Sequence, residues 1–269
     1  MICCERWACF EAQKGIRGMG SMGDTTPVDA AVFTTLRWEN GRAAWLGDHL
    51  SRLKSHAERL GIVWPSDFED RLTKIHPSGD GNLCQIRLSK DGEIELTLRL
   101  AEYPPSPLAA SSQAAPRFTH RAQGTKHAAW DGYSNARLNA INQGTDIGLL
   151  VHEGVVVDGD RCTPVLLDAD GVAFAPTPEG GGIDSITLNI LKPAIEAAGI
   201  PFRYARLTET LLGRAAEIIV VGTGVGVAWL SEIDGQKVGS GTPGPLFETC
   251  TQAFETALEI SWTQLGAAR

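Results

Sequence analysis

The sequence has few of the features that mark membrane, secreted or nucleic-acid-binding proteins. Its longest apolar stretch, residues 216–230, is interrupted by glycines and is too short to cross a bilayer. Residues 1–25 lack the apolar core of a signal peptide. The formal net charge is -8, and no basic run offsets it, which argues against a nucleic-acid partner. These absences predict an ordinary globular protein of the cytoplasm that has no membrane partner.

Paired cysteines and metal-ligand spacings are also missing. The six cysteines have no spacing typical of a zinc site, and no disulfide framework is expected in a chain of this size. The six histidines show no ligand spacing either, so we expect no metal. Cys162 lacks the histidine and asparagine pattern of a thiol nucleophile and is expected to be a small buried residue. The scattered cysteines are Cys3, Cys4, Cys9, Cys84, Cys162 and Cys250.

The residues that are present predict an α+β protein of two domains. With 269 residues, 43% of them hydrophobic, the chain can bury a sizeable core. Residues 104–118 are rich in proline, serine and alanine without any period, which indicates an interdomain linker. We therefore expect an N-terminal α+β domain at 26–103 and a C-terminal α/β domain at 119–269. Residues 1–25 contain internal methionines and are expected to be a disordered arm or a mis-assigned start.

Hydrophobic periodicity and turn residues predict the elements of both domains. The expected N-terminal elements are strands at 32–38, 43–46, 83–88 and 94–100, a helix from an Asp48 cap to Gly61, and a second helix from Ser66. The expected C-terminal elements are helices at 134–142, 185–198, 208–215 and from 245, strands at 147–151, 155–157, 165–167, 172–174, 202–207 and 217–221, and a hairpin at 234–235. The N-terminal strands, joined by tight turns, indicate an antiparallel sheet.

Lysine is scarce, and one of the seven stands apart from the others. Six fall on polar helix faces, in turns or in the N-terminal segment, where solvated roles account for them. Lys126, in GTKHAAWDGY, stands at the beginning of the C-terminal domain without such a role. Asp158 follows 32 residues later, just past a strongly apolar strand pattern. The residues alone leave alternatives open, since Lys126 could be a surface charge and Asp158–Gly159 an ordinary turn.

Two segments of the C-terminal domain could bind a phosphate. Ile186–Thr187 opens a helix after GGGID, where unpaired backbone N–H groups and the positive end of the helix dipole would point at an anion. Gly222–Thr223, in VVGTGVGV, follows a strand and could add a backbone and a hydroxyl contact. This run is not a dinucleotide fingerprint, because the G-x-G-x-x-G spacing fails and no long helix follows.

Five segments in order resemble the class IV aminotransferase family, also called the fold type IV pyridoxal phosphate enzymes. They are VFTTLRW, LGDHLSRLKSHAERLGI, DGVAFAPTPEGGGIDSIT, AEIIVVGTGVGV and IDGQKVGSGTPGP, and the likeness extends over about residues 32–260. Within the family, the chain is most similar to the 4-amino-4-deoxychorismate lyases. The resemblance implies a two-domain enzyme with a D-amino acid aminotransferase-like fold, pyridoxal 5′-phosphate between the domains, and a homodimeric assembly.

By position, the resemblance assigns Lys126 as the Schiff-base lysine, twenty residues before an acidic residue of the family, which is Asp146 here. Asp158 stands where the family usually has a glutamate against the pyridine nitrogen of the cofactor. Aspartate can serve the same electrostatic purpose, but it is shorter by one methylene. The two residues that usually follow as Ser-Asn are Cys162 and Thr163 in this chain.

The resemblance also assigns the phosphate and substrate contacts. Arg52, in DHLSRL, would hold the cofactor phosphate, for which its fork of donors is well suited. On the residues alone, Arg52 could equally lie on a solvated helix face. The other residues assigned to the cofactor are Ile186, Thr187, Gly222 and Thr223. The substrate is expected to be a small amino compound carrying carboxylate, and the candidates for binding it are Thr34, Thr35, Arg37, Arg137 and Arg161.

Three activities follow from this resemblance. The first is a lyase that expels pyruvate from 4-amino-4-deoxychorismate and leaves 4-aminobenzoate, which the VFTTLRW and DHLSRL segments and the chain length favour. The second is an aminotransferase for branched-chain or D-amino acids, which is favoured by Ala129–Trp130, where lyases often have Asn-Arg. The third is a diverged homologue that binds the cofactor without turnover, suggested by the departures at Asp158 and Thr163.

Overall fold

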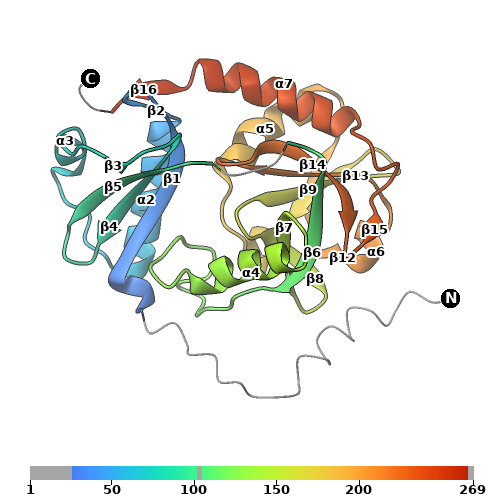
Figure 1. Ribbon diagram of the computed structural model, residues 1–269, viewed down its shortest axis with the longest axis horizontal. Coiled ribbons are helices and arrows are strands. Elements are labelled where there is room, and N and C mark those ends of the chain that lie inside the picture. The colour runs from blue at the N-terminus through green and yellow to red at the C-terminus, as the bar shows by residue number, and fades with distance from the viewer. Residues whose placement is uncertain (1–25, 102–104, 266–269) are drawn as a thin grey trace.

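The fold consists of two β-sheets with helices packed against them. The computed structural model describes residues 26–101 and 105–265. The expectation for residues 1–25 therefore lies outside the described residues. In Figure 1 the N-terminal sheet lies on the left and the C-terminal sheet on the right, with the red helix along the top of the C-terminal part.

The N-terminal sheet is built mainly from the first part of the chain. Its strands are β1 (Ala31–Glu39), β2 (Arg42–Ala44), β3 (Ser78–Gly79), β4 (Leu83–Ser89), β5 (Ile94–Arg99) and β16 (Trp262–Gln264), in the order β16-β2-β1-β4-β5-β3. Its helical elements are η1 (Val28–Ala30), α2 (Leu46–Leu60) and α3 (Phe68–Leu72). The apolar stripe of α2, with Leu53 and Ala57, packs against Leu36 and Ile86 of the sheet.

Helix α2 begins two residues before the predicted Asp48 cap. The preceding residue, Trp45, has a left-handed backbone with φ 50 and no capping side chain. Its ring packs on Phe254, with the ring centroids 5.5 Å apart, so a tertiary contact accompanies the turn into the helix. Asp48 consequently lies in the first helical turn, where its charge suits the helix dipole. Gly61 ends the helix as predicted, in a left-handed conformation with φ 72.

The C-terminal sheet is mixed and curls around its own core. Its strands are β6 (Leu108–Ala114), β7 (Ile147–His152), β8 (Val155–Gly159), β9 (Thr163–Asp168), β10 (Ala173–Pro176), β11 (Phe202–Ala205), β12 (Leu207–Thr208), β13 (Ala215–Gly222), β14 (Gly226–Ile233) and β15 (Gln236–Lys237). The order is β11-β10-β9-β13-β14-β6-β7-β8-β12, with β15 on β14. The predicted strand 202–207 is thus split between the two ends of the sheet, which brings these ends close together.

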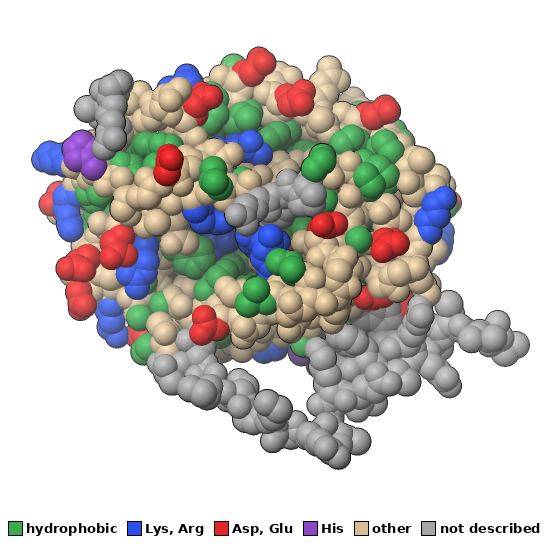
Figure 2. Space-filling view, in the orientation of Figure 1, with side chains coloured by type: hydrophobic (Ala, Val, Ile, Leu, Met, Phe, Trp, Pro, Cys, Tyr) green, Lys and Arg blue, Asp and Glu red, His purple; other side chains and the backbone are tan. Residues whose placement is uncertain are grey.

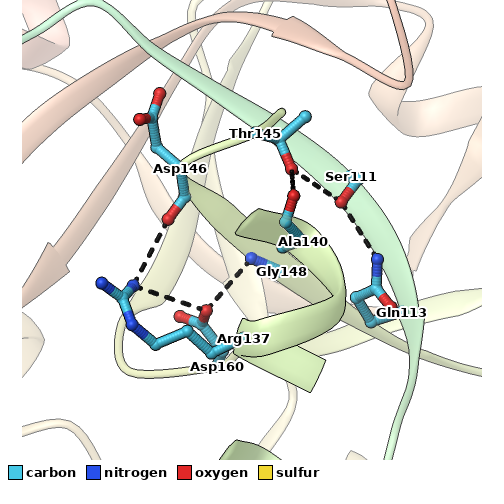
Figure 3. A network of polar contacts seen from close by, with 8 residues as sticks. All are labelled: Ser111, Gln113, Arg137, Ala140, Thr145, Asp146, Gly148 and Asp160. Atoms are coloured by element: carbon cyan, nitrogen blue, oxygen red, sulfur yellow. Dashed lines mark hydrogen bonds and ion pairs between the residues drawn. The ribbon is translucent and has the colours of Figure 1, made fainter. Parts of the chain in front are cut away.

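Part of the predicted linker 104–118 is a strand inside this sheet. Residues 108–114 form β6, which pairs in parallel with both β7 and β14. Serine and glutamine are tolerated there because each finds a partner from a distant segment. Ser112 donates from its backbone N and its hydroxyl to the Asp234 carboxylate, at 2.8 and 2.6 Å. Figure 3 shows Ser111 bonded to Thr145 and Gln113.

Helices cover both sides of the C-terminal sheet. They are α4 (Asp131–Asn142), α5 (Ile186–Ala197), α6 (Glu209–Leu212) and α7 (Pro245–Glu259), and a short η2 (Pro178–Gly180) lies in a loop. Helices α5 and α7 pack on each other and on β13, whereas α4 packs on β6 and β7. After α7 the chain returns to the first sheet, where β16 pairs with β2 (Figure 1). None of the helices in the described residues is both long and apolar enough to cross a membrane.

A buried carboxylate, Glu217 of β13, holds the first turn of α7. Its two oxygens accept hydrogen bonds from the backbone N–H groups of Gly244, Leu246 and Phe247, at 3.0, 3.0 and 2.9 Å. Pro245, the first residue of α7, has no N–H to satisfy. One side chain from the sheet therefore satisfies most of the free donors at this helix end.

We predict that Glu217→Ala lowers the free energy of unfolding by about 2–4 kcal/mol, because three buried N–H groups lose a charged acceptor. Urea unfolding followed by circular dichroism measures this change. Glu255→Ala, on the exposed side of α7, is the control and should change stability by less than about 0.5 kcal/mol. Equal stability of the two variants would contradict this role for Glu217.

Candidate active site

The largest concentration of chemically active side chains lines a cavity of about 450 Å³ between the two sheets. All the residues that the sequence assigned to the cofactor line it: Arg52, Lys126, Asp158, Ile186, Thr187, Gly222 and Thr223. They come from α2, from the segment before α4, from β8, from the start of α5 and from the end of β13. On the face shown in Figure 2, lysine and arginine side chains gather at the centre, between green hydrophobic side chains.

The backbone of Lys126 is fixed by contacts with the N-terminal sheet. The carbonyl of Lys126 accepts from Phe33 N at 3.1 Å, and Ala128 N donates to Ala31 O at 2.9 Å. Lys126 N donates to Nδ1 of His56, on α2, at 3.1 Å. These bonds pair residues 126–128 with β1 in a short antiparallel bridge. The lysine side chain therefore enters the cavity from a segment held at several points.

The amine of Lys126 is enclosed by aromatic rings. Its Nζ lies 4.7 Å from the ring centroid of Trp130 and 5.3 Å from that of Phe33. These two rings meet edge to face, and Trp130 also stacks on Tyr133 with the centroids 3.9 Å apart. Burial, aided by the charges of Arg52 and a second guanidinium and opposed by Asp158, lowers the pKa of Lys126 to about 7. The amine is thus available in its unprotonated form near neutral pH.

Asp158 faces the same cavity from β8. The pairing of β7 with β8 shifts register between Leu150 and Val151, an irregularity that changes the direction of the strand next to Asp158. One oxygen of Asp158 accepts from the Thr163 hydroxyl at 3.2 Å, and the other accepts from Ile183 N at 2.8 Å. Burial raises the pKa of Asp158 to about 7 against these hydrogen bonds. The alternative of an ordinary turn is wrong, because Asp158 is a buried strand residue.

Arg52 is held by β1 and by the loop before α5 rather than solvated. Its Nη1 donates to Asp184 O at 2.8 Å, and its Nη2 donates to the Thr34 hydroxyl at 2.9 Å. The Thr34 hydroxyl can then donate to Nδ1 of His49, which is 2.8 Å away. Among the described residues, the buried Nε of Arg52 has no hydrogen-bond partner. Thr34 therefore orients Arg52 and does not line the cavity, whereas Thr35 lines it.

The two predicted phosphate-binding segments line the same cavity. Ser185 caps α5 by accepting from Leu188 N at 3.3 Å, so the N–H groups of Ile186 and Thr187 have no helical partner. Opposite them, Gly222 ends β13, and a Cβ at this position would lie 3.0 Å from Arg161 O. The close approach of the loop between β8 and β9 explains the glycine.

Arg37 does not have the expected place in the substrate pocket. Its Nε donates to Thr223 O at 3.0 Å and its Nη2 to Gly224 O at 3.4 Å, while the guanidinium lies 4.9 Å from the Phe254 ring centroid. It is absent from the cavity lining described above. Arg37 therefore holds the 223–224 turn from outside the cavity, because its position on β1 directs its side chain toward α7.

Arg137 and Arg161 do line the cavity, as predicted. Figure 3 shows Arg137 between the carbonyl of Asp146 and the carboxylate of Asp160, with the latter ion pair at 3.9 Å. Asp146 lies outside the cavity lining, and its carboxylate accepts from Ala109 N at 2.9 Å. Cys162 also lines the cavity, but burial raises its thiol pKa well above the ordinary value, which disfavours a nucleophile.

Sequence reasoning missed several residues of the lining. Arg99, the last residue of β5, lines the cavity, and so do the aromatic residues Phe33, Trp130 and Tyr133. The strict alternation of residues 94–100 was a usable signal, since it predicted a strand that ends at the domain junction. It could not indicate what this strand end would face. Among the described residues, no cluster of histidine, cysteine and acidic side chains could hold a metal ion.

We predict that the Lys126 amine of the cofactor-free protein reacts with acetic anhydride with a midpoint near pH 7 rather than 10.5, because only the unprotonated amine reacts and burial favours that form. Mass spectrometry of the labelled peptide across pH gives the midpoint. Asp158→Asn removes the carboxylate that raises this pKa, so its midpoint should be lower still. A midpoint near 10 in the unmodified protein would contradict the enclosure of the amine.

Comparisons with known proteins agree with this geometry. The profile of the family described as Amino-transferase class IV matches residues 31–233. The D-alanine aminotransferase of Listeria monocytogenes serotype 1/2a is 22% identical over 260 residues, which cover 88% of this chain and 90% of that protein.

Solved structures give the same fold. A branched-chain aminotransferase of Thermoproteus uzoniensis, determined with norvaline, has a TM-score of 0.72 at 21% identity and covers 88% of this chain and 90% of its own. A Legionella pneumophila protein assigned provisionally as a 4-amino-4-deoxychorismate lyase has a TM-score of 0.72 at 16% identity, covering 88% and 97%. The chain belongs to the class IV aminotransferase family and is a pyridoxal phosphate-dependent enzyme of fold type IV.

Proposed function

We propose that this cavity holds pyridoxal 5′-phosphate with its phosphate at Arg52 and the 186–187 and 222–223 segments, its ring nitrogen at Asp158 and its aldehyde carbon at Lys126. The buried, unpartnered Nε of Arg52 supports the phosphate position, since a buried charged donor is costly without an acceptor. The Asp158 carboxylate and the Lys126 amine, which come from different elements and line the same cavity, support the positions of the ring nitrogen and the aldehyde carbon. The residues present therefore fit the cofactor.

The cofactor supplies an aldehyde that combines with amines and a ring that accepts electrons from the substrate. In the proposed reaction, the Lys126 amine removes the proton from the substrate carbon that bears the amino group. Its lowered pKa leaves the amine unprotonated for this step. Asp158 holds a proton at the ring nitrogen, and Thr163 and Ile183 N fix the direction of its carboxylate. Trp130 and Phe33 keep water from the amine.

We propose that the reaction is a lyase reaction of the 4-amino-4-deoxychorismate type. The supporting observation is a cavity in which aromatic side chains and three arginines, Arg99, Arg137 and Arg161, lie together. This combination suits a ring-shaped amino substrate that carries more than one carboxylate. After proton removal, the bond from the ring carbon to the ether oxygen breaks and the ring becomes aromatic as 4-aminobenzoate. The leaving group is enolpyruvate, which takes up a proton to become pyruvate, so the proton removed by Lys126 is balanced.

An aminotransferase activity is the second candidate. It is favoured by the D-alanine aminotransferase of Listeria, whose likeness extends over most of this chain. In this case the Lys126 ammonium returns the proton to a different carbon from the one that it deprotonated. A 2-oxo acid then accepts the amino group in a second half-reaction.

We predict that adding pyridoxal phosphate produces an absorbance band near the edge of the visible range and that Lys126→Ala abolishes it. Arg52→Ala should weaken binding of pyridoxal phosphate by about tenfold to a hundredfold, because charged hydrogen bonds are lost, but should change binding of pyridoxal much less. Lys54→Ala, on the exposed side of α2, is the control and should bind both normally.

A band that persists in Lys126→Ala would contradict the assignment of this lysine. A band that shifts when an amino donor is added rejects the alternative of a non-catalytic homologue. A band that no amine changes would support that alternative instead.

We predict that the enzyme with bound cofactor releases equal amounts of pyruvate and 4-aminobenzoate from 4-amino-4-deoxychorismate without a 2-oxo acid. A coupled lactate dehydrogenase assay measures pyruvate, and chromatography measures 4-aminobenzoate. A panel of L- and D-amino acids with 2-oxo acids serves as the comparison. Amino transfer in this panel, without pyruvate release from the first substrate, would reject the lyase and support the aminotransferase.

A further inference from the structure

Two polar side chains meet in the otherwise apolar interface between β1 and α2. On β1, Val32, Thr34 and Leu36 share one face of the strand, and all three are fully buried. On α2, His49 is also fully buried and lies one turn before Leu53, on the same face of the helix. Leu36 and Leu53 pack in the cluster between the sheet and the helix. Thr34 and His49 therefore occupy positions where apolar side chains would pack.

The hydrogen bonds of this pair lead to Arg52. Oγ1 of Thr34 lies 2.8 Å from Nδ1 of His49 and accepts from Nη2 of Arg52 at 2.9 Å. An arginine side chain can only donate, so the Thr34 oxygen is the acceptor in that bond, and its single proton is available to His49. Among the described residues, Nε2 of His49 has no hydrogen-bond partner. Because a buried polar side chain is costly in an apolar interface, the contact with Thr34 calls for a functional reason.

We propose that His49 is a positioning residue for the cofactor phosphate, an inference that rests on the proposed function. By accepting the Thr34 proton at Nδ1, His49 leaves the lone pairs of the Thr34 oxygen to Arg52. The guanidinium is then anchored at two nitrogens, Nη2 by Thr34 and Nη1 by the carbonyl of Asp184. Because a guanidinium is planar and rigid, two anchors also fix the direction of its Nε. This Nε is the buried donor that supports the phosphate position.

The arrangement requires that Nδ1 of His49 carries no proton. A protonated Nδ1 would donate to the Thr34 oxygen and compete with Arg52 for its lone pairs. Burial, aided by the positive charges of Arg52 and Lys126, holds the pKa of His49 well below its ordinary value. The ring therefore stays neutral, and the hydrogen bond keeps its direction.

Binding of pyridoxal phosphate, compared with binding of pyridoxal, measures this role. We expect His49→Leu, which accepts no hydrogen bond, to weaken binding of pyridoxal phosphate by about threefold to thirtyfold and to leave pyridoxal binding unchanged. His49→Asn, whose side chain retains an acceptor, should keep most of the affinity. Leu60→Val, on the buried face near the end of α2, is the matched control for lost packing and should bind both compounds normally. Calorimetry measures all these affinities.

A double-mutant cycle tests whether His49 acts through Thr34. Thr34→Val removes the hydroxyl and should by itself weaken binding of pyridoxal phosphate. In this background His49→Leu should cause no further loss, because its connection to Arg52 is already broken. Thr34→Ser, which keeps the hydroxyl, should retain most of the affinity. A full effect of His49→Leu in Thr34→Val would show that the imidazole acts by another route and would overturn the proposal.

Nitrogen NMR of the histidines provides a readout that does not depend on affinity. We expect the His49 signals of the unmodified protein to show an unprotonated Nδ1 and a protonated Nε2 between about pH 5 and 8, a range in which exposed histidines titrate. The His49→Asn spectrum identifies these signals. A proton on Nδ1 at neutral pH would contradict the proposed direction of the hydrogen bond.

The ratio of the two affinities separates positioning from support of the fold. If His49→Leu weakens pyridoxal and pyridoxal phosphate equally, or weakens neither, the proposal is wrong. Circular dichroism shows whether each variant folds, and if His49→Leu does not, the NMR signals and the affinities of His49→Asn decide. Failure of the proposed function is distinguishable, because Arg52→Ala would then bind pyridoxal phosphate normally. Weaker binding in Arg52→Ala but not in His49→Leu would overturn this inference alone.

Discussion

The arrangement of the site depends on a short backbone pairing between segments that are far apart in the sequence. Residues 126–128 pair with β1 in a short antiparallel bridge, and His56 of α2 accepts the hydrogen bond of Lys126 N. The N-terminal sheet therefore fixes the backbone position of Lys126, which belongs to the C-terminal part of the chain. Because backbone groups and the His56 imidazole make the hydrogen bonds that fix this segment, the lysine side chain is not needed to hold it in place. Its amine can be enclosed completely and remain available for chemistry.

Enclosure also determines the charge balance of the cavity. Burial lowers the pKa of Lys126 and raises that of Asp158, so that both pKa values are about 7. Arg52 of α2 and Arg99 of β5 add positive charge, and Asp158 opposes them. A cavity of this kind favours occupants with anionic groups at two places. A phosphorylated cofactor and a carboxylated substrate have this distribution together.

The sequence was informative for features that depend on the conformation of the local backbone. Helix starts, glycine turns and the phosphate-binding segments depend on neighbouring residues, so Gly61 and Thr187 could be assigned before any contact was known. The direction of long side chains depends on distant segments, which explains why Arg37 and Arg99 were misjudged or missed. Residues 108–114 show the same limit, because a serine-rich strand is stable only when distant residues satisfy its polar groups.

The return of β16 to the first sheet has a consequence for how the chain folds. This strand pairs with β2 through residues 262–264, more than 200 positions later in the chain. A ribosome must therefore synthesise the chain through residue 264 before the first sheet acquires its edge strand. Until then β2 presents an open ladder to any other strand nearby. Efficient production of the enzyme in cells should accordingly depend on protection of this nascent edge.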